Sequence, residues 1–265
     1  MPGRLQDKIA LVTGAGSVGP GWGNGKATAT LFAREGARIF AVDRNAEAVE
    51  ETRGIIEAEG GTCIAYATDV TKNTNVQAMV EACLAAFGRI DILYNNVGGS
   101  APGGPVEMSE EVWDQQMDLN LKHVFLACKH VLPVMESQGK GAIVNIGSIA
   151  GLRHFGPDVI GYSATKAAVI QFTRALGVQY AKRGIRANTV VPGLMHTPLV
   201  DVRLVGQRGG GDRDKLLESR HAQVPTGRMG DAWDVAYAAL YLASDEAKYV
   251  TATEIVVDGG ITARC

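Results

Sequence analysis

The sequence predicts a doubly wound α/β fold in which helices cover both faces of a seven-stranded parallel sheet. Seven apolar runs of strand length recur along the 265 residues, and most are rich in Val and Ile. Strands that are covered on both faces have this composition, and the segments between them are long enough for crossover helices. A glycine-dense turn directly after the first run is a third observation in favour of this fold class.

The elements follow one another without a repeat or a linker. The predicted strands are KIALVTG, ARIFAVD, TCIAYATD, IDILYNN, AIVNIGS, IRANTVVPG and EIVVDGG. The amphipathic segments between them predict helices at about 25–35, 45–59, 73–88, 109–137, 162–183, 212–221 and 231–244. We therefore expect a single domain over residues 1–265. The segment from about 193 to 224 lacks clear periodicity and contains three consecutive glycines, 209–211, which predicts a mobile loop over the site.

Net charge and composition limit the classes of partner that we expect this protein to bind. The net charge is −2, and the 26 basic residues are scattered, so we expect no nucleic acid as a partner. No apolar run approaches the length of a membrane span, and the first residues do not resemble a signal peptide. Cys63, Cys83, Cys128 and Cys265 show no C-x-x-C spacing, which favours free thiols in a reducing cytoplasm. These observations predict a cytoplasmic protein that does not bind membranes.

The glycine-dense turn reads TGAGSVGPGWGNGKATA and opens directly onto a predicted helix. Glycines allow a tight turn close to a pyrophosphate, and the helix N-terminus offers free N–H groups to the anion. Asp43 at the end of the second strand is suited to a ribose diol and would repel a 2′-phosphate, which favours NAD over NADP. Arg44 beside it weakens this preference, because an arginine can accommodate a phosphate.

A second motif is suited to acid/base chemistry. Tyr162 and Lys166 are four residues apart in a predicted helix, so they lie on one face, and Ser148 precedes them after a strand. A phenol ionises near pH ~10, and a close ammonium in a dry site favours the phenolate. A Y-x-x-x-K pair alone is common by chance, so its meaning depends on the residues upstream.

Taken together, these motifs resemble the short-chain dehydrogenase/reductase family, and the resemblance extends from Thr13 to Gly260. The matching motifs are Thr13-Gly14 with Gly23-x-Gly25, Asp69, Asn95-Asn96-Val97-Gly98, Asn120, Ser148, Tyr162, Lys166, Pro192-Gly193 and Thr197. The resemblance implies a Rossmann-type domain that transfers a hydride between NAD and an alcohol or ketone. It also implies a homotetramer, and the apolar residues on several faces of helices 109–137 and 162–183 agree with subunit contacts.

The resemblance implies a role for each matching residue. Tyr162 would be the general acid/base, Lys166 would lower its pKa and bind the nicotinamide ribose, and Ser148 would hold the substrate carbonyl. Asn120 would position a water that links Lys166 to solvent. The implied cofactor-binding residues are Gly14, Ser17, Gly23, Asn24, Gly25, Asp43, Arg44, Asp69, Val70, Asn96, Gly98, Tyr162, Lys166, Pro192, Gly193 and Thr197. Within this set Asp69 and Val70 would flank the adenine, Asn96 the adenosine ribose, and Thr197 the carboxamide.

The turn departs from the family pattern, because eight residues rather than three separate Gly14 from Gly23. Gly19-Pro20-Gly21 is an alternative to the later glycine pair, although the helical segment that begins after Gly25 favours the later one. A lengthened turn also resembles the enoyl-thioester reductase branch of this fold, which reduces a carbon–carbon double bond. That branch separates its tyrosine and lysine more widely, so carbonyl chemistry is favoured.

The resemblance places the substrate among three loops with a largely apolar lining. Their residues are Gly99, Ser100, Pro102, Ile149, Leu152, His154, Phe155, Val159, Leu194, His196 and Leu199. We expect a small or medium uncharged alcohol or ketone, bound by Ser148, His154, Tyr162 and Leu194. Arg153 and Arg203 would instead attract a carboxylate. The remaining histidines, at 123, 130 and 221, show no metal-ligand spacing, so we expect no metal.

A second class of function is compatible with the fold. A cofactor-binding sensor or scaffold would keep the dinucleotide site without turnover. The presence of Asn120, Ser148, Tyr162 and Lys166 together argues against it, because a binding protein has no chemical need of the phenol.

Overall fold

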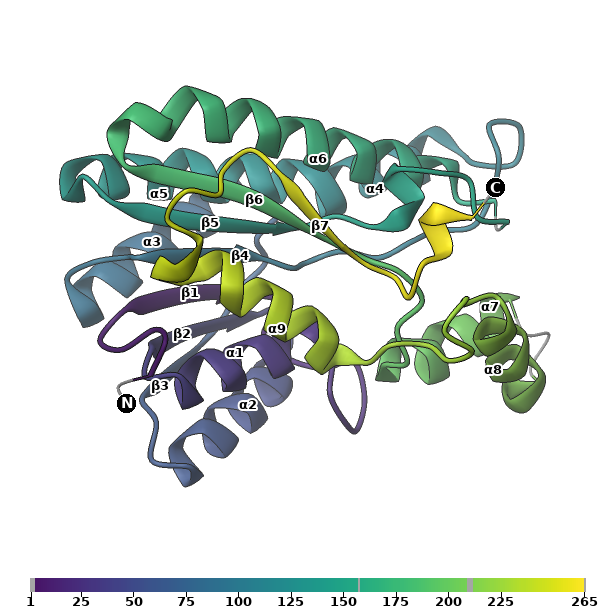
Figure 1. The fold of residues 1–265 in the computed structure, drawn as a ribbon, viewed down its shortest axis with the longest axis horizontal. Helices are drawn as coiled ribbons and strands as arrows, with labels where there is room; N and C mark the ends of the chain where they lie inside the picture. Colours follow the sequence, from purple (N-terminus) through teal and green to yellow (C-terminus); the bar gives the residue numbers. More distant parts are fainter. Residues whose placement is uncertain (1–2, 157, 209–211, 265) are drawn as a thin grey trace.

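A computed structural model describes residues 3–156, 158–208 and 212–264 of the chain. Its centre is one seven-stranded sheet in the order β3-β2-β1-β4-β5-β6-β7, and every neighbouring pair of strands is parallel (Figure 1). The strands are β1 (Ile9–Thr13), β2 (Arg38–Asp43), β3 (Cys63–Ala67), β4 (Ile92–Asn95), β5 (Gly141–Ile146), β6 (Ile185–Pro192) and β7 (Glu254–Val257). The predicted parallel sheet and its seven strands are confirmed.

Helices cover both faces of the sheet, as the continuous apolar strands require (Figure 1). Phe32, Val49 and Leu240, from α1, α2 and α9, belong to one hydrophobic core, and Val76, Val131 and Val169, from α3, α5 and α6, belong to the other. The helices are α1 (Asn24–Arg34), α2 (Ala46–Ala58), α3 (Asn73–Phe87), α4 (Glu110–Met117), α5 (His123–Gln138), α6 (Ile160–Tyr180), α7 (Val205–Arg208), α8 (Arg213–Ala222) and α9 (Ala232–Ala243).

The helix expected at 109–137 contains a change of hydrogen-bond register. A π-helical segment, Asp118–Lys122, joins α4 to α5, and the backbone stays in the right-handed helical region through both junctions. Asn120 lies in this segment and is fully buried. Single π-helical turns within a helix are frequent at functional sites, because they redirect side chains and main-chain carbonyls.

The segment at 193–224 is more helical than expected. Only a helix at 212–221 was predicted there, whereas the structure also has a π-helical segment, Val200–Leu204, that continues into α7. Val200 and Leu204 are both buried, four residues apart. Val202 between them is exposed, so the apolar residues of this segment do not mark a single helical face, which explains why the sequence did not reveal this turn. Glycines 209–211 lie outside the described residues, and the mobility of the segment stays a prediction.

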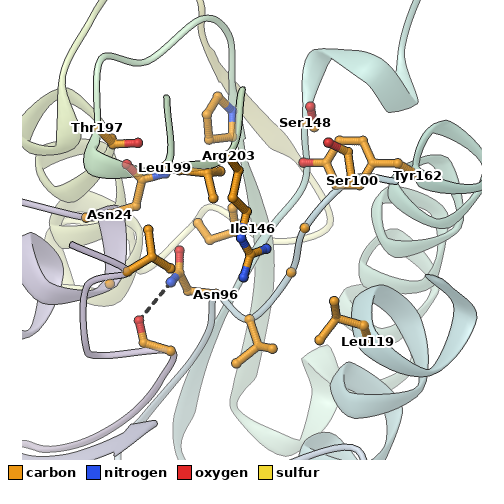
Figure 2. Close-up of a pocket in the computed structure, with 18 of the residues that line it drawn as sticks. Asn24, Asn96, Ser100, Leu119, Ile146, Ser148, Tyr162, Thr197, Leu199 and Arg203 are labelled. Atoms are coloured by element: carbon orange, nitrogen blue, oxygen red, sulfur yellow. Dashed lines mark hydrogen bonds between the residues drawn. The ribbon is translucent and has the colours of Figure 1, made fainter. Parts of the chain in front are cut away.

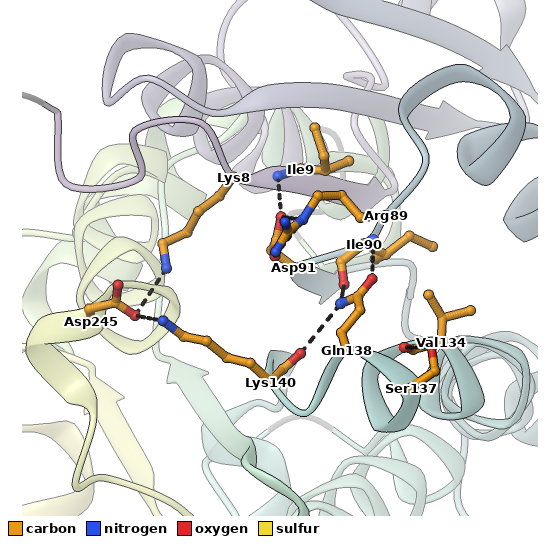
Figure 3. A network of polar contacts seen from close by, with 10 residues as sticks. All are labelled: Lys8, Ile9, Arg89, Ile90, Asp91, Val134, Ser137, Gln138, Lys140 and Asp245. Atoms are coloured by element: carbon orange, nitrogen blue, oxygen red, sulfur yellow. Dashed lines mark hydrogen bonds and ion pairs between the residues drawn. The ribbon is translucent and has the colours of Figure 1, made fainter.

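Polar contacts tie the amino ends of the central strands together (Figure 3). The Asp91 carboxylate accepts a hydrogen bond from the Ile9 amide (2.9 Å) and pairs with Arg89. Asp245, after α9, pairs with both Lys8 and Lys140 at 3.0 Å. Contacts that stabilise the fold therefore occupy the amino ends of the strands. The residues predicted for the site follow the carboxyl ends instead.

At the carboxyl ends of the strands, the strand order reverses beside β1. A crevice that can bind a ligand forms at such a point in this type of sheet. β1 pairs with β2 on one side and with β4 on the other, so the connections after β1 and β4 leave in opposite directions. Gly25 at the start of α1 packs directly on Gly14 after β1, and a Cβ on Gly25 would lie 1.8 Å from the Gly14 carbonyl oxygen. The helix therefore approaches the strand end only if residue 25 is glycine.

We expect Gly25→Ala to lower the free energy of unfolding by about 2–3 kcal/mol, because the added methyl group would force the helix and the strand apart. Gly54→Ala is the matched control. A Cβ there meets nothing within 4 Å in the middle of α2, so the alanine should raise the free energy of unfolding by about 0.5–1 kcal/mol. Urea denaturation of both variants measures the difference, and equal values for the two would contradict the close approach.

Candidate active site

A cavity of about 810 Å³ opens at the carboxyl ends of the strands. Nearly all of the predicted site residues line it. These are Gly14, Ser17, Gly23, Asn24, Gly25, Asp43, Arg44, Asp69, Val70, Asn96, Gly98, Ser148, Tyr162, Lys166, Pro192, Gly193, Leu194 and Thr197. Of the residues that were assigned a catalytic role or a direct contact with cofactor or substrate, two are absent from the lining. Asn120 lies behind the wall, and His154 is an exposed residue on the loop after Ser148.

The glycine turn closes one end of the cavity. Gly14 has a positive φ of 66°, and its carbonyl oxygen accepts a hydrogen bond from the Asn96 side chain at 3.0 Å. Gly23 is the N-cap of α1, which begins at Asn24, as the later of the two glycine pairs requires. The buried Oδ1 atom of Asn24 has no hydrogen-bond partner among the described residues. An unpaired polar atom beside a helix N-terminus fits a bound phosphate group or its water.

The extra residues of the turn pack against the segment after β6, and the first of them, Val18, lines the cavity. A Cβ on Gly19 would lie 3.0 Å from Val202, and one on Gly21 would lie 3.4 Å from Pro198, so the turn contacts the segment after β6. Trp22 anchors the far end of the turn, with its ring 4.8 Å from that of Trp233 in α9. The lengthened turn therefore contacts residues of the cavity wall, Pro198 and Val202, on one side and α9 on the other.

Asp43 is oriented by the turn that faces it. Its Oδ2 accepts a hydrogen bond from the Gly16 amide and its Oδ1 accepts one from the Asn45 amide, both at 3.0 Å. A carboxylate offers about four acceptor positions. Two therefore remain for the hydroxyl groups of a ligand in the cavity.

Ser148 and Tyr162 face each other across the other end of the cavity. Figure 2 shows Ser148, Ser100 and the hydroxyl end of Tyr162 in the same region. Ser148 follows β5, where its Oγ accepts a hydrogen bond from the Ala150 amide (3.2 Å), and Tyr162 lies in the first turn of α6. Three hydroxyl groups thus converge on one part of the cavity.

Lys166 is buried beneath this group, with a fractional exposure of 3%. Its Nζ lies 5.7 Å from the centre of the Tyr162 ring and donates a hydrogen bond of 2.7 Å to the Ile146 carbonyl oxygen. Burial lowers the pKa of the Lys166 ammonium to about 8, because a charge that loses water is disfavoured. Ile146 accepts only one of its three protons, so the other two can reach groups in the cavity.

Asn120 holds the wall of the cavity in place. Its side chain accepts a hydrogen bond from the Gly99 amide (2.9 Å) and donates to the Gly99 carbonyl (3.1 Å) and to the carbonyl groups of Gln116. A Cβ on Gly98 would lie 2.8 Å from Asn120 Oδ1 and 3.3 Å from Lys166 Nζ. The two polar side chains therefore approach each other across a glycine.

Two residues near the site were not predicted from the sequence. Gln116 lines the cavity and accepts hydrogen bonds from Ala101 and Asn120. Its spacing of four residues before Asn120 was an available signal. His123 is buried one turn after Asn120 with no ring hydrogen bond of good geometry among the described residues. Burial, and then the nearby Lys166 charge, lower its pKa to about 3, with a weak opposing contribution from the Leu119 main chain.

The structure divides the predicted substrate loops into two groups. Gly99, Ser100, Ile149, Phe155, Leu194 and Leu199 line the cavity, whereas Pro102, Leu152, His154, Val159 and His196 do not. The two arginines that were considered for a carboxylate also separate. Arg203 lines the cavity, and Arg153 is exposed outside it.

The sequence led us to expect neither a metal site nor a membrane-spanning segment. Among residues 3–156, 158–208 and 212–264, no three His, Cys, Asp or Glu side chains are grouped as metal ligands. Within the same ranges, no helix has the length and apolar character needed to cross a membrane.

Comparisons with known proteins agree with this geometry. A family model described as "Enoyl-(Acyl carrier protein) reductase" matches residues 20–262. The chain is 38% identical over 260 residues to 3-oxoacyl-(acyl-carrier-protein) reductase FabG of Thermotoga maritima, covering 97% of this chain and 99% of the relative. It is 39% identical over 260 residues to 2-(R)-hydroxypropyl-CoM dehydrogenase of Xanthobacter autotrophicus, with 97% and 99% covered.

Solved structures of similar sequence also superpose on this chain. A protein from Burkholderia xenovorans classed as a short-chain dehydrogenase/reductase superposes with a TM-score of 0.96 at 53% identity, covering 99% of each chain. Levodione reductase superposes with a TM-score of 0.92 at 33% identity, covering 98% of this chain and 100% of the other. With the fold, the cavity and its relatives in agreement, this chain belongs to the short-chain dehydrogenase/reductase family and is an oxidoreductase.

Proposed function

We propose that this protein transfers a hydride between NAD and a small or medium alcohol or ketone, with Tyr162 as the general acid/base. The observation that carries the proposal is the convergence of Ser148, Tyr162 and the buried Lys166 on one end of a cavity whose other end is a glycine turn. We further propose that the whole chain forms one dinucleotide-binding and catalytic domain, in which the segment at 193–224 moves over the substrate.

Ser148, Tyr162 and Lys166 each have a separate role in the proposed proton transfer. Nicotinamide, when bound, supplies or accepts the hydride. The Ser148 hydroxyl holds the substrate oxygen, and the Tyr162 hydroxyl exchanges the proton with it. The Lys166 ammonium, held in a dry site at 5.7 Å from the Tyr162 ring, stabilises the phenolate that forms. Asn120 fixes the Gly99 backbone through its side chain, so the implied water would be held by its main-chain carbonyl in the π-helical turn.

The chain's own residues fit a dinucleotide without a 2′-phosphate. Asp43 retains acceptor capacity for a ribose diol at the end of β2, and the Asn24 oxygen lacks a partner beside the N-terminus of α1. Arg44 also lines the cavity. Asp69 and Val70 would flank the adenine, Asn96 would lie beside the adenosine ribose, and the segment from Pro192 to Thr197 would hold the carboxamide.

Reduction of an enoyl thioester is the main alternative chemistry, and the description of the matching family model names it. The positions of Tyr162 and Lys166 on successive turns of α6, with Ser148 facing the tyrosine, support carbonyl chemistry instead. The names of the Thermotoga and Xanthobacter relatives, a 3-oxoacyl reductase and a hydroxypropyl dehydrogenase, point the same way. A sensor without turnover would not require this arrangement.

We also propose a cytoplasmic homotetramer. Cys63, Cys83 and Cys128 are buried free thiols, as expected in a reducing compartment, while Cys265 lies outside the described residues. Phe125 on α5 and Val178 on α6 have fractional exposures of 50% and 72%. Large apolar residues on two neighbouring helices support subunit contacts there.

Tyr162→Phe should reduce turnover of secondary alcohols by roughly 10²–10⁴-fold, because it removes the proton carrier. Its affinity for NADH should stay within about threefold of wild type, which is less than 1 kcal/mol. Tyr180→Phe, at the far end of the same helix and outside the cavity lining, is the matched control. NADH absorbance across an alcohol panel measures turnover, and an active Tyr162→Phe enzyme would rule out the mechanism.

The wild-type protein should bind NAD at least about tenfold more tightly than NADP, since the Asp43 carboxylate repels a 2′-phosphate. Asp43→Asn keeps a hydrogen-bond acceptor for Gly16 and removes the charge, so it should bring the two affinities close together. Asp69→Asn removes a carboxylate from the same cavity and should leave their ratio unchanged. Calorimetric titration with both nucleotides measures the ratio. Comparable wild-type affinities would refute the role of Asp43.

The stability of the ligand-free protein should depend on the charge of Lys166. The folded protein releases this proton near pH 8, whereas the unfolded chain keeps it to about 10.5. Stability should therefore rise with pH across this window, by roughly 3 kcal/mol relative to Lys166→Met, and the difference should be flat below it. The lost hydrogen bond to Ile146 adds only a constant offset. Urea denaturation of both proteins from pH 6.5 to 10.5 tests this, and a pH-independent difference would contradict it.

A further inference from the structure

Arg203 places a positive charge in the middle of the cavity. Its side chain extends between Asn96 and the region of Ser148 and Tyr162 (Figure 2). Its Nη1 atom lies 3.0 Å from the position of a Cβ on Gly99, so the guanidinium packs on the wall that Asn120 holds from the other side. The charge therefore lies against the backbone segment that also carries Ser100.

In the structure, where the segment lies against the cavity, the backbone of Arg203 is held in a packed turn. It belongs to the π-helical segment Val200–Leu204, whose first and last residues are 1% and 7% exposed and thus anchor the turn on both sides of the arginine. A guanidinium on an anchored turn is better suited to recognition than one on a loose loop, because less conformational freedom is lost on binding.

No described carboxylate neutralises this charge. Three acidic residues line the cavity, and each is engaged elsewhere: Asp43 by the Gly16 and Asn45 amides, Asp69 by Thr71, and Asp118 by Lys122. The next carboxylate along the segment, Asp201, bonds to Arg213. Arg203 itself has no ion pair within the part of the chain that the structure describes.

We infer that Arg203 binds a carboxylate on the substrate, so that the preferred substrate is an acidic alcohol or ketone. This inference rests on the proposed function and revises the uncharged substrate expected from the apolar lining. A planar guanidinium can donate two parallel hydrogen bonds to a carboxylate, which fixes orientation as well as charge. The substrate would then be held at two points, its oxygen by Ser148 and Tyr162 and its carboxylate by Arg203.

The pyrophosphate of the dinucleotide is the other anion that the cavity would receive. The glycine turn and the N-terminus of α1 supply amide donors for it at the opposite end. Arg203 packs instead on Gly99, between Asn96 and the region of Ser148 and Tyr162 and away from the glycine turn. The substrate is therefore the anion that the position of Arg203 favours, and experiment separates the two.

The test uses matched pairs of secondary hydroxy acids and their amides, with carbon chains of different lengths, in NAD reduction by the purified full chain. Wild type should show kcat/KM at least about tenfold higher for the best acid than for its amide. Arg203→Met should remove this preference by raising KM for the acid, while the amide changes by less than about threefold. Arg203→Lys should restore part of it. Arg153→Met removes an exposed arginine outside the lining and should behave as wild type.

The outcomes separate this inference from the proposed function. Turnover of amides and neutral alcohols without preference for acids would overturn the role of Arg203 and leave the proposed reaction standing. A loss of NADH affinity in Arg203→Met, with acids and amides affected equally, would assign the arginine to the pyrophosphate and also overturn it. If wild type turns over none of the pairs, the proposed reaction fails. Titrating the same pairs into the NADH complex, followed by NADH fluorescence, then decides on Arg203 alone, because equal binding of acid and amide would refute it.

Discussion

A positive charge held out of water is the constraint around which this site is arranged. Lys166 keeps its ammonium under the cavity with a single described acceptor, the Ile146 carbonyl. Burying a charge is costly, and the cost is tolerated only where fixed partners or a ligand repay it. The surrounding residues follow from this. Gly98 has no side chain because Lys166 and Asn120 both approach it, and Asn120 is held by Gly99 and Gln116.

The same edge of the sheet satisfies a steric constraint at its other end. The helix α1 must begin against the end of β1 for its N-terminal amides to face the cavity, and Gly14 and Gly25 make that contact possible. The two ends of the cavity both lie beside β4, and the chain continues from the end of β4 into Asn96 and Gly98. One strand end thus connects the glycine-turn end of the cavity to the Tyr162 end.

The sequence was sufficient for the strands, for the two helical layers and for the motif residues of the glycine turn and the Tyr162 end that line the cavity. Buried parallel strands and glycine turns are local patterns, so they can be recognised without coordinates. The π-helical turn at Asn120 could not be predicted, because a register shift of one hydrogen bond leaves the apolar spacing almost unchanged. Arg153 and Arg203 are the same residue type in two loops, and only the fold decides which of them enters the cavity. His154 was expected at the substrate and lies outside for the same reason.

The lengthened glycine turn changes the binding edge of this fold at little cost in folding free energy. Closing a turn of eight residues instead of three costs less than about 1 kcal/mol in chain entropy, because that cost grows only with the logarithm of length. The contact between Trp22 and Trp233 stabilises the turn by a comparable amount. The longer turn is therefore nearly neutral for folding, and yet it places new surface against Pro198 and Val202, which line the cavity. Selection can thus adjust the entrance of the site almost independently of the stability of the sheet beneath it.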